Sequence, residues 1–143
     1  MNNSSTVCVD ACLVIRRVVS LSGPVHALWE TWAQENCRLV APALLYYEVT
    51  NGLYQYQKAG VLPVEAVNKS LAAALALPIE LVSDSALHKR AKALAETYNL
   101  PASYDAHYLA LAERLGADLW TTDERLVNSL KPFKITWVKL AGV

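Results

Sequence analysis

The sequence predicts an α/β fold, specifically a three-layer α/β/α sandwich around a parallel sheet. Short apolar segments, each ended by a proline, an acid or a turn, alternate along the chain with longer segments of helical periodicity. Parallel neighbouring strands need crossover connections of this length, which are usually helices. The strand-like segments are themselves apolar, as expected when helices cover both faces of the sheet.

The elements follow from this alternation in chain order. The segments predicted as strands are 6–9, 38–40, 78–82, 118–122 and 135–138. The segments predicted as helices are 11–19, 24–36, 43–59, 63–77, 84–98, 101–116 and 124–130. Asp84 or Ser85 suits the N-cap of its helix, Ser103 suits the next, and Gly116 is a typical helix end.

Length and composition indicate one compact domain, residues 1–143. The 143 residues are 54% hydrophobic and 18% charged, which is apolar enough to close one core. The thirteen Lys and Arg balance the thirteen Asp and Glu. No net charge therefore draws in a polyanion, and any nucleic-acid site needs a local basic patch. Residues Met1 to Ser5 are polar and are expected to fray.

The cysteines and the apolar runs indicate a cytoplasmic protein without a membrane segment. Cys8, Cys12 and Cys37 are odd in number and lack the spacings of a zinc site or a secreted disulfide framework, so we expect free thiols. An acid and two arginines interrupt the early apolar run, which argues against a secretory signal. No stretch approaches membrane-spanning length without a charge or a proline.

Two aspartates directly follow predicted strands. Asp10 ends the first strand and Asp123 ends the fourth. Ligands in open parallel sheets bind beyond the carboxyl ends of the strands. If these two strands are neighbours, both carboxylates lie in one crevice.

Two further acids lie on apolar stripes of predicted helices. Asp105 is followed at helical spacing by Leu109 and Ala112, and Glu48 is preceded one turn earlier by Leu44. An acid on a buried stripe needs a partner, and no Lys or Arg shares either stripe. A shared divalent cation would satisfy all four acids. An oxygen-only ligand set suits Mg²⁺ or Mn²⁺ better than Zn²⁺.

Each acid also has a structural interpretation. A lone Asp at a strand end is more often a helix cap than a ligand. A Glu on a mostly apolar helix often extends to solvent. Only the joint placement of the four acids points to a metal site.

Four blocks of the sequence, in order, resemble the PIN-domain family and specifically its VapC-type toxins. The blocks are residues 7–11, 40–53, 103–112 and 119–126. The first carries Asp10, the second Glu48 with Asn51, and the third Asp105. The fourth is a strand that runs into a Thr-x-Asp turn at Asp123. The resemblance covers nearly the whole chain.

The resemblance implies a five-stranded parallel sheet and a ribonuclease site that holds Mg²⁺ or Mn²⁺. The acids that it implies for metal binding and catalysis are Asp10, Glu48, Asp105 and Asp123. Thr121 and Asn51 are implied as supporting residues. An RNA substrate and a cognate antitoxin are the implied partners.

One position departs from the family pattern. Family members commonly have Ser, Thr or Asn two residues after the first Asp, where this chain has Cys12. A thiol is a weak hydrogen-bond donor, so the supporting role of that position is in question. The four acids themselves are intact, and we expect activity.

Candidate contact residues for RNA and for a second copy of the chain come from composition. Arg16, Arg17 and Arg125 lie near the first and last acids in sequence and are predicted to contact the RNA backbone.

Aromatic residues gather early in the chain, namely Trp29, Trp32, Tyr46, Tyr47, Tyr54 and Tyr56. These residues could stack on bases, but aromatic residues are also enriched at interfaces, and we expect an interface. Together with the low charge they predict a homodimer.

Three other interpretations compete with the nuclease. A haloacid-dehalogenase-type phosphatase uses a second Asp two positions after the first, where this chain has Cys12. A receiver-type phosphorylation module needs an acceptor Asp on a middle strand, and that strand is missing. A non-catalytic PIN fold that only binds its partner is distinguished by a test for metal-dependent RNA cleavage.

Overall fold

The computed structural model describes residues 5–142, so the expectation for residues 1–4 lies outside the described residues. The strands are β1 (Thr6–Val9), β2 (Arg38–Pro42), β3 (Ile79–Val82), β4 (Asp118–Thr121) and β5 (Val138–Leu140). They form one sheet in the order β3-β2-β1-β4-β5, in which every neighbouring pair is parallel. The predicted parallel five-stranded sheet is confirmed.

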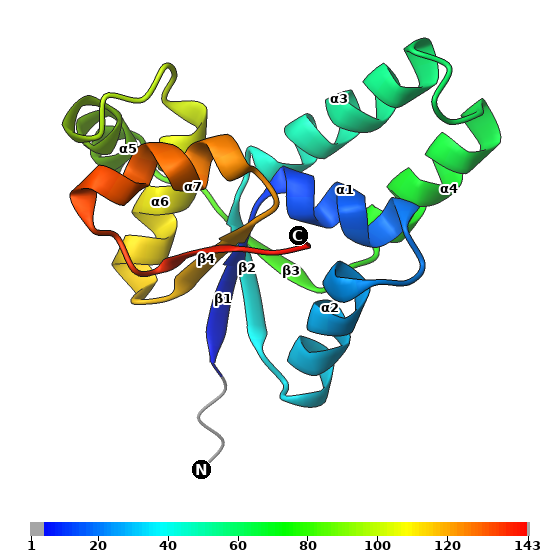
Figure 1. Cartoon of the computed structure of the whole chain (residues 1–143), viewed down its shortest axis with the longest axis horizontal. Coiled ribbons are helices and arrows are strands. Elements are labelled where there is room, and N and C mark those ends of the chain that lie inside the picture. The colour runs from blue at the N-terminus through cyan, green and yellow to red at the C-terminus, as the bar shows by residue number, and fades with distance from the viewer. Residues whose placement is uncertain (1–4, 143) are drawn as a thin grey trace.

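Helices cover both faces of this sheet. They are α1 (Ala11–Val19), α2 (Pro24–Gln34), α3 (Leu45–Lys58), α4 (Val64–Leu75), α5 (Ser85–Thr97), α6 (Tyr104–Leu115) and α7 (Glu124–Leu130). A short 3-10 helix, Lys131–Phe133, follows α7. Figure 1 shows α1 to α4 gathered on one side of the sheet and α5 to α7 on the other. The predicted three-layer α/β/α sandwich is therefore confirmed.

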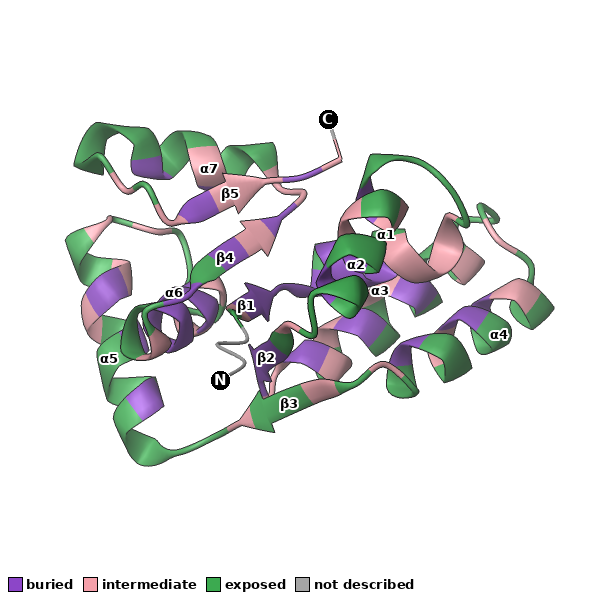
Figure 2. Ribbon diagram, turned by 90° about the horizontal axis from the view of Figure 1, so that it is seen from below, coloured by how far each residue is buried: buried purple, intermediate pink, exposed green. Residues whose placement is uncertain are grey.

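The core lies between the sheet and the inner faces of the helices, as the buried segments in Figure 2 show. Val7 to Val9 of β1 are buried. Trp29 and Trp32 of α2 are also buried, and Trp32 packs edge-on against Trp120 with ring centroids 6.0 Å apart. The prediction that these two tryptophans belong to an exposed aromatic interface is wrong, because α2 turns them inward to close the core. Tyr47, by contrast, is exposed.

The order of the strands creates a switch point beside β1. The chain runs outward from β1 through β2 to β3, and then returns through α5 and α6 to β4 on the other side of β1. Val9 of β1 lies opposite Trp120 of β4. The carboxyl ends of these two strands are therefore neighbours, which meets the condition for a shared crevice, and ligands of open α/β sheets bind at such a point.

The last strand lies later in the chain than predicted. Strand β5 is Val138–Leu140 instead of 135–138. Lys134 has a left-handed backbone with a φ of 56°, and the pairing with β4 begins where the Leu119 N–H donates to the Trp137 carbonyl. The β-prone run starts earlier, but the hydrogen bonds to β4 decide which of its residues form a strand.

Local predictions at other element ends are mixed. The Asp84 carboxylate caps α5 by accepting the Leu87 N–H at 2.8 Å, as expected. Ser103 occupies the N-cap of α6, but its side chain makes no capping hydrogen bond. Strand β2 continues through Pro42, two residues beyond its predicted end, because Pro42 pairs in register with Val82 of β3.

The structure also bears on the thiols and on membrane segments. Cys8, Cys12 and Cys37 are free thiols, as predicted. Within residues 5–142, no single helix is long and apolar enough to cross a membrane. Only α1 and α2 taken together, a pair bent by 102°, pass by length and composition.

Candidate active site

The first carboxylate lies where β1 gives way to α1. Asp10 is the N-cap of α1, and its Oδ1 accepts the Leu13 N–H at 2.9 Å. Only 6% of the residue is exposed. Burial raises the pKa of Asp10 to about 7, against the hydrogen bonds from Thr121 and Leu13, and the charges of Asp105 and Asp123 raise it further. Asp10 is therefore both a helix cap and a desolvated acid.

The second carboxylate occupies the equivalent place after β4. Asp123 is the N-cap of α7, and its Oδ1 accepts the Arg125 N–H at 3.0 Å and the Leu126 N–H at 3.4 Å. The fully buried Thr121 hydroxyl accepts the Asp123 N–H at 3.0 Å. Thr121 thus touches the acids at both strand ends, since it also hydrogen-bonds Asp10.

The other two acids come from the first turns of α3 and α6. Glu48 is half-buried, and its Oε1 accepts the Tyr108 hydroxyl at 2.6 Å. Burial raises the pKa of Glu48, and the charge of Asp105 raises it further. Burial also raises the pKa of Asp105, with a contribution from Asp123. Each helix therefore points an acid toward the other acids instead of toward solvent.

Cys12 shows that the four acids share one neighbourhood. Burial raises the pKa of its thiol to about 12, and the charges that raise it further are those of Asp10, Asp123, Asp105 and Glu48. The fold thus gathers all four predicted acids around the start of α1. None of the four forms an ion pair within the described part of the chain.

The four acids suit a divalent cation in their chemistry. All four groups are carboxylates, the ligands that Mg²⁺ and Mn²⁺ prefer. Burial and mutual repulsion raise the pKa values of Asp10, Glu48 and Asp105. A bound cation would offset both effects by stabilising the ionised carboxylates. In residues 5–142, however, no three Asp, Glu, His or Cys side chains are already gathered at the spacing that holds one ion. The residues fit the chemistry of the ion, and binding would draw their side chains together.

The three arginines predicted to contact RNA separate into two places. Arg16 and Arg125 line a cavity of about 400 Å³ together with Thr122 and Asp123. Arg17 lies in a different cavity, on the side of α1 that faces α2. Of the supporting residues, Asn51 is exposed on α3, and its Oδ1 accepts a hydrogen bond from Gln55 at 3.4 Å.

Comparison with known proteins identifies the family. The sequence pattern of the PIN domain matches residues 7–129, a span that contains the four acids. The chain belongs to the PIN-domain family. This PIN domain is 37% identical over 123 residues to ribonuclease VapC3 of Mycobacterium tuberculosis, in the CDC 1551 / Oshkosh and ATCC 25618 / H37Rv strains, with 86% of each chain covered.

A solved structure supports the fold of this PIN domain. The crystal structure of PAE2754 from Pyrobaculum aerophilum superposes with a TM-score of 0.64 at 22% identity. The superposition covers 90% of this chain and 87% of that one. At this identity the likeness extends to the fold alone.

Sequence reasoning missed one residue of this PIN-domain site. Tyr108, which holds Glu48, is almost fully buried. It lies three residues after Asp105 on α6, and that helical spacing was the available signal. His107, the residue before Tyr108, lies near enough to lower the pKa of Glu48 when charged. It hydrogen-bonds His88 at 2.9 Å and the Ser103 carbonyl at 2.7 Å.

Proposed function

We propose that this PIN domain is a metal-dependent ribonuclease whose site is formed by Asp10, Glu48, Asp105 and Asp123. The observation that carries the proposal is the gathering of these acids around Cys12, with no cationic side chain paired to them in residues 5–142. Buried carboxylates without a counter-ion are costly, and a bound divalent cation would offset that cost. The ribonuclease name of the 37% identical relatives supports the same activity.

Each residue has a definite task in this proposal. Asp10 and Asp123 stand on the two sides of the switch point, with Thr121 between them. Tyr108 fixes the direction of Glu48 through its hydroxyl. Mg²⁺ or Mn²⁺, when bound, would supply Lewis-acid stabilisation of the phosphoryl oxygens and a bound water that ionises readily.

The pKa of Asp10 links metal binding to pH. Since burial raises this pKa to about 7, part of the protein carries a protonated Asp10 at neutral pH when no cation is present. A ligand carboxylate must be ionised, so binding of the ion releases that proton and metal affinity rises with pH.

We propose that Arg16 and Arg125 contact the RNA backbone. Both guanidinium groups line the cavity that also contains Asp123, and neither is paired with an acid in the described residues. A phosphate held there lies beside the acid at the end of β4. Arg17 is not part of this contact, because it lines another cavity.

The VapC name of the relatives supports a proposal for the biological setting. We propose that the chain is one cytoplasmic domain and acts as a toxin neutralised by a small antitoxin. A basic side chain of the antitoxin placed among the four acids would compete with the cation. The exposed tyrosines of α3, Tyr47, Tyr54 and Tyr56, support the proposal of a homodimer.

The test compares two aspartates at opposite ends of β4. Asp123 follows β4 at its carboxyl end, while Asp118 begins β4 at the other end and is exposed. Asparagine also caps helices well, so Asp123→Asn keeps α7. We expect Asp123→Asn to lower Mn²⁺-dependent cleavage of total cellular RNA by about 100-fold or more, and Asp118→Asn to leave it unchanged.

The outcome separates the nuclease from a non-catalytic PIN fold. Wild-type cleavage that persists in EDTA, or that survives Asp123→Asn, contradicts the metal site. Binding of RNA without cleavage in Mg²⁺ or Mn²⁺ favours the non-catalytic module. Growth arrest on expression of the wild type but not of Asp105→Asn tests the toxin proposal separately.

A further inference from the structure

Two cavities meet at the acid that follows β4. The first, of about 400 Å³, is lined by Arg16 and Thr122 and lies where the RNA backbone is proposed to bind. The second, of about 410 Å³, lies between the loop before α6 and helix α7. Asp123 and Arg125 line both, so the two cavities adjoin across these residues.

The second cavity, called the loop–α7 cavity below, reaches two of the four acids. Asp105 of α6 and Asp123 at the end of β4 line it. Its other lining residues are Leu100, Pro101, Arg125, Leu126 and Ser129. A phosphodiester held at the acids would therefore have this cavity beside it.

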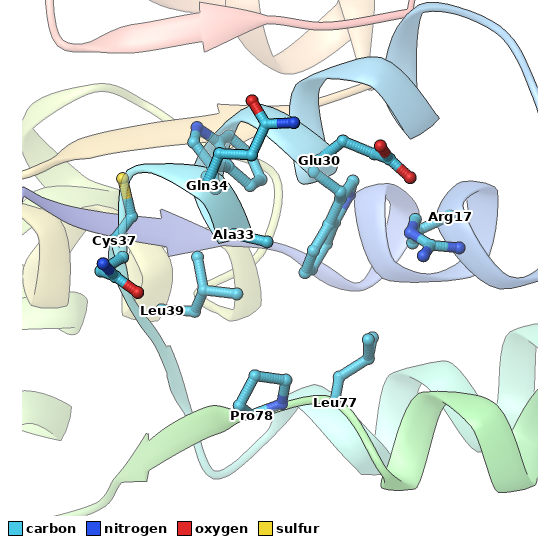
Figure 3. Close-up of a pocket in the computed structure, with 11 residues that line it drawn as sticks. Arg17, Glu30, Ala33, Gln34, Cys37, Leu39, Leu77 and Pro78 are labelled. Carbon is cyan, nitrogen blue, oxygen red and sulfur yellow. The ribbon is translucent and has the colours of Figure 1, made fainter.

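The position of the loop–α7 cavity differs from that of the cavity beside Arg17. Figure 3 shows the latter, which reaches Leu39 and Pro78 at the amino ends of β2 and β3. The loop–α7 cavity lies instead at the carboxyl end of β4, where ligands of open α/β sheets bind. Its occupant therefore adjoins whatever the acids bind.

The two adjoining cavities differ in chemistry. The cavity beside Arg16 has two guanidinium groups, which suit phosphate. The loop–α7 cavity adds an apolar wall of Leu100, Pro101 and Leu126. Pro101 and Ser129 are exposed and Leu100 is half-buried, so a ligand can reach this surface. Nucleobases stack on apolar side chains and on guanidinium planes, which suits this cavity to a base.

Ser129 adds a directional hydrogen-bond acceptor to the apolar wall. Its hydroxyl donates to the Leu126 carbonyl at 2.7 Å, so its hydrogen is used within α7. The lone pairs of the Ser129 oxygen can still accept. Such an oxygen favours a base edge that presents an N–H group.

We propose that the loop–α7 cavity holds the base of the nucleotide beside the scissile phosphate, and that Ser129 selects among bases. Leu100 and Pro101 pack against the face of the base, and the Ser129 oxygen accepts from its edge. These are positioning residues, since they do not touch the reacting atoms. The inference rests on the proposed ribonuclease function, because the acids and arginines bring the RNA to the cavity.

Binding is measured with the four nucleoside 5′-monophosphates in Mg²⁺, and ribose 5-phosphate is the matched control without a base. None of these probes contains a phosphodiester, so binding is separated from cleavage. We expect at least one nucleotide to shift the amide NMR signals of Leu100 and Ser129 in a saturable way, and ribose 5-phosphate to leave both unmoved. Equal shifts with ribose 5-phosphate, or no shift with any nucleotide, would overturn the proposal.

Two substitutions of Ser129 test its role. Ser129→Leu fills the cavity and should weaken binding of the best nucleotide at least about tenfold. Ser129→Ala removes only the acceptor and should weaken it about three- to tenfold. Asn128→Ala, at an exposed neighbour that lines neither cavity, is the control and should change nothing. Unchanged binding in both Ser129 variants, or an equal loss in Asn128→Ala, contradicts the proposal.

Sequencing of the fragments cut from a random-sequence RNA pool in Mn²⁺ connects the cavity to cleavage. The wild type should prefer particular bases beside the cut. Ser129→Ala should reduce this preference about threefold or more, and Asn128→Ala should keep it. Base-dependent shifts without cleavage support the base cavity and contradict the nuclease. Cleavage without a base preference beside the cut contradicts the base cavity and leaves the nuclease intact.

Discussion

The acids of this protein divide into two regions with opposite electrostatics. On the surface of α5 and α6, Asp84 pairs with Arg114 and Glu113 pairs with Arg90, each at 2.7 Å. The hydrogen bonds from these arginines lower the pKa of both acids, to about 2 for Asp84. At the carboxyl ends of β1 and β4, burial raises the pKa of Asp10 to about 7.

The difference separates acids that contribute to folding from acids that are reserved for a ligand. The surface acids reach their cations within the chain and stay ionised in mild acid. The acids at the carboxyl ends of β1 and β4 are desolvated and repel one another. Both effects disfavour their charged forms. A protein that keeps such a cluster gives up stability at that place, and functional sites are where such clusters concentrate.

The largest effect should come from Asp10→Asn. Asparagine can keep the cap on Leu13 but removes a desolvated charge. We expect metal-dependent RNA cleavage to fall by about 100-fold or more. At pH 8 without metal, the unfolding free energy should rise by about 1 to 3 kcal/mol. Chemical denaturation at pH 8 measures this change. If Asp10→Asn is less stable than the wild type there, the charge of Asp10 does not destabilise the fold, and the contrast with the surface acids is contradicted.

The next effect is a pH dependence of stability in the metal-free wild type. The pKa of folded Asp10 lies near 7, above its ordinary value of 3.8, so its contribution is fully present below pH 3.8 and is lost as pH rises through 7. Denaturation midpoints measured from pH 5 to pH 8 should therefore fall more in the wild type than in Asp10→Asn. Addition of Mg²⁺ at pH 8 should restore the denaturation midpoint of the wild type but not change that of Asp10→Asn. If the midpoint falls equally with pH in both proteins, Asp10 is not the cause of the pH dependence.

A smaller effect is expected from Tyr108→Phe. The change removes the hydroxyl that donates to Glu48 at 2.6 Å. In the wild type this hydrogen bond lowers the pKa of Glu48. We expect a stability loss of about 1 to 2 kcal/mol and roughly tenfold weaker metal binding or activity. Tyr104→Phe, an exposed tyrosine on the same helix, is the control. Titration of Mn²⁺ by calorimetry measures the metal affinity, and an unchanged affinity would remove Tyr108 from the site.

The smallest effect should come from Asp84→Asn in the surface region. Asparagine can still accept the Leu87 N–H, so the change tests mainly the pairing with Arg114. The pKa of folded Asp84 is lowered from 3.8 to about 2, so its contribution is present above pH 3.8 and is lost as pH falls through 2. The variant should unfold at a slightly lower temperature at pH 6 and match the wild type below pH 2. A difference that persists there would point to the cap instead.

The sequence predicted the strands and helices well where the residues act locally. Asp84 was one of two predicted caps of its helix, since capping depends on a few neighbouring amide groups, and it is the residue that caps. The sequence failed where partners are distant along the chain. Trp29 and Trp32 appeared as aromatic surface because only the packing of α2 against the sheet turns them inward. Arg17 appeared beside the acids because only the rotation of α1 separates it from Arg16.

By itself, the sequence determined the fold class, the parallel sheet and the candidacy of four acids, because periodicity and strand-end position are local properties. The tertiary structure alone decided that β1 and β4 are neighbours, and that acids spread from Asp10 to Asp123 share one neighbourhood around Cys12. It also decided which acids find an arginine, as Asp84 does, and which do not. Burial and electrostatic coupling depend on distances through space, and those distances exist only once the chain has folded.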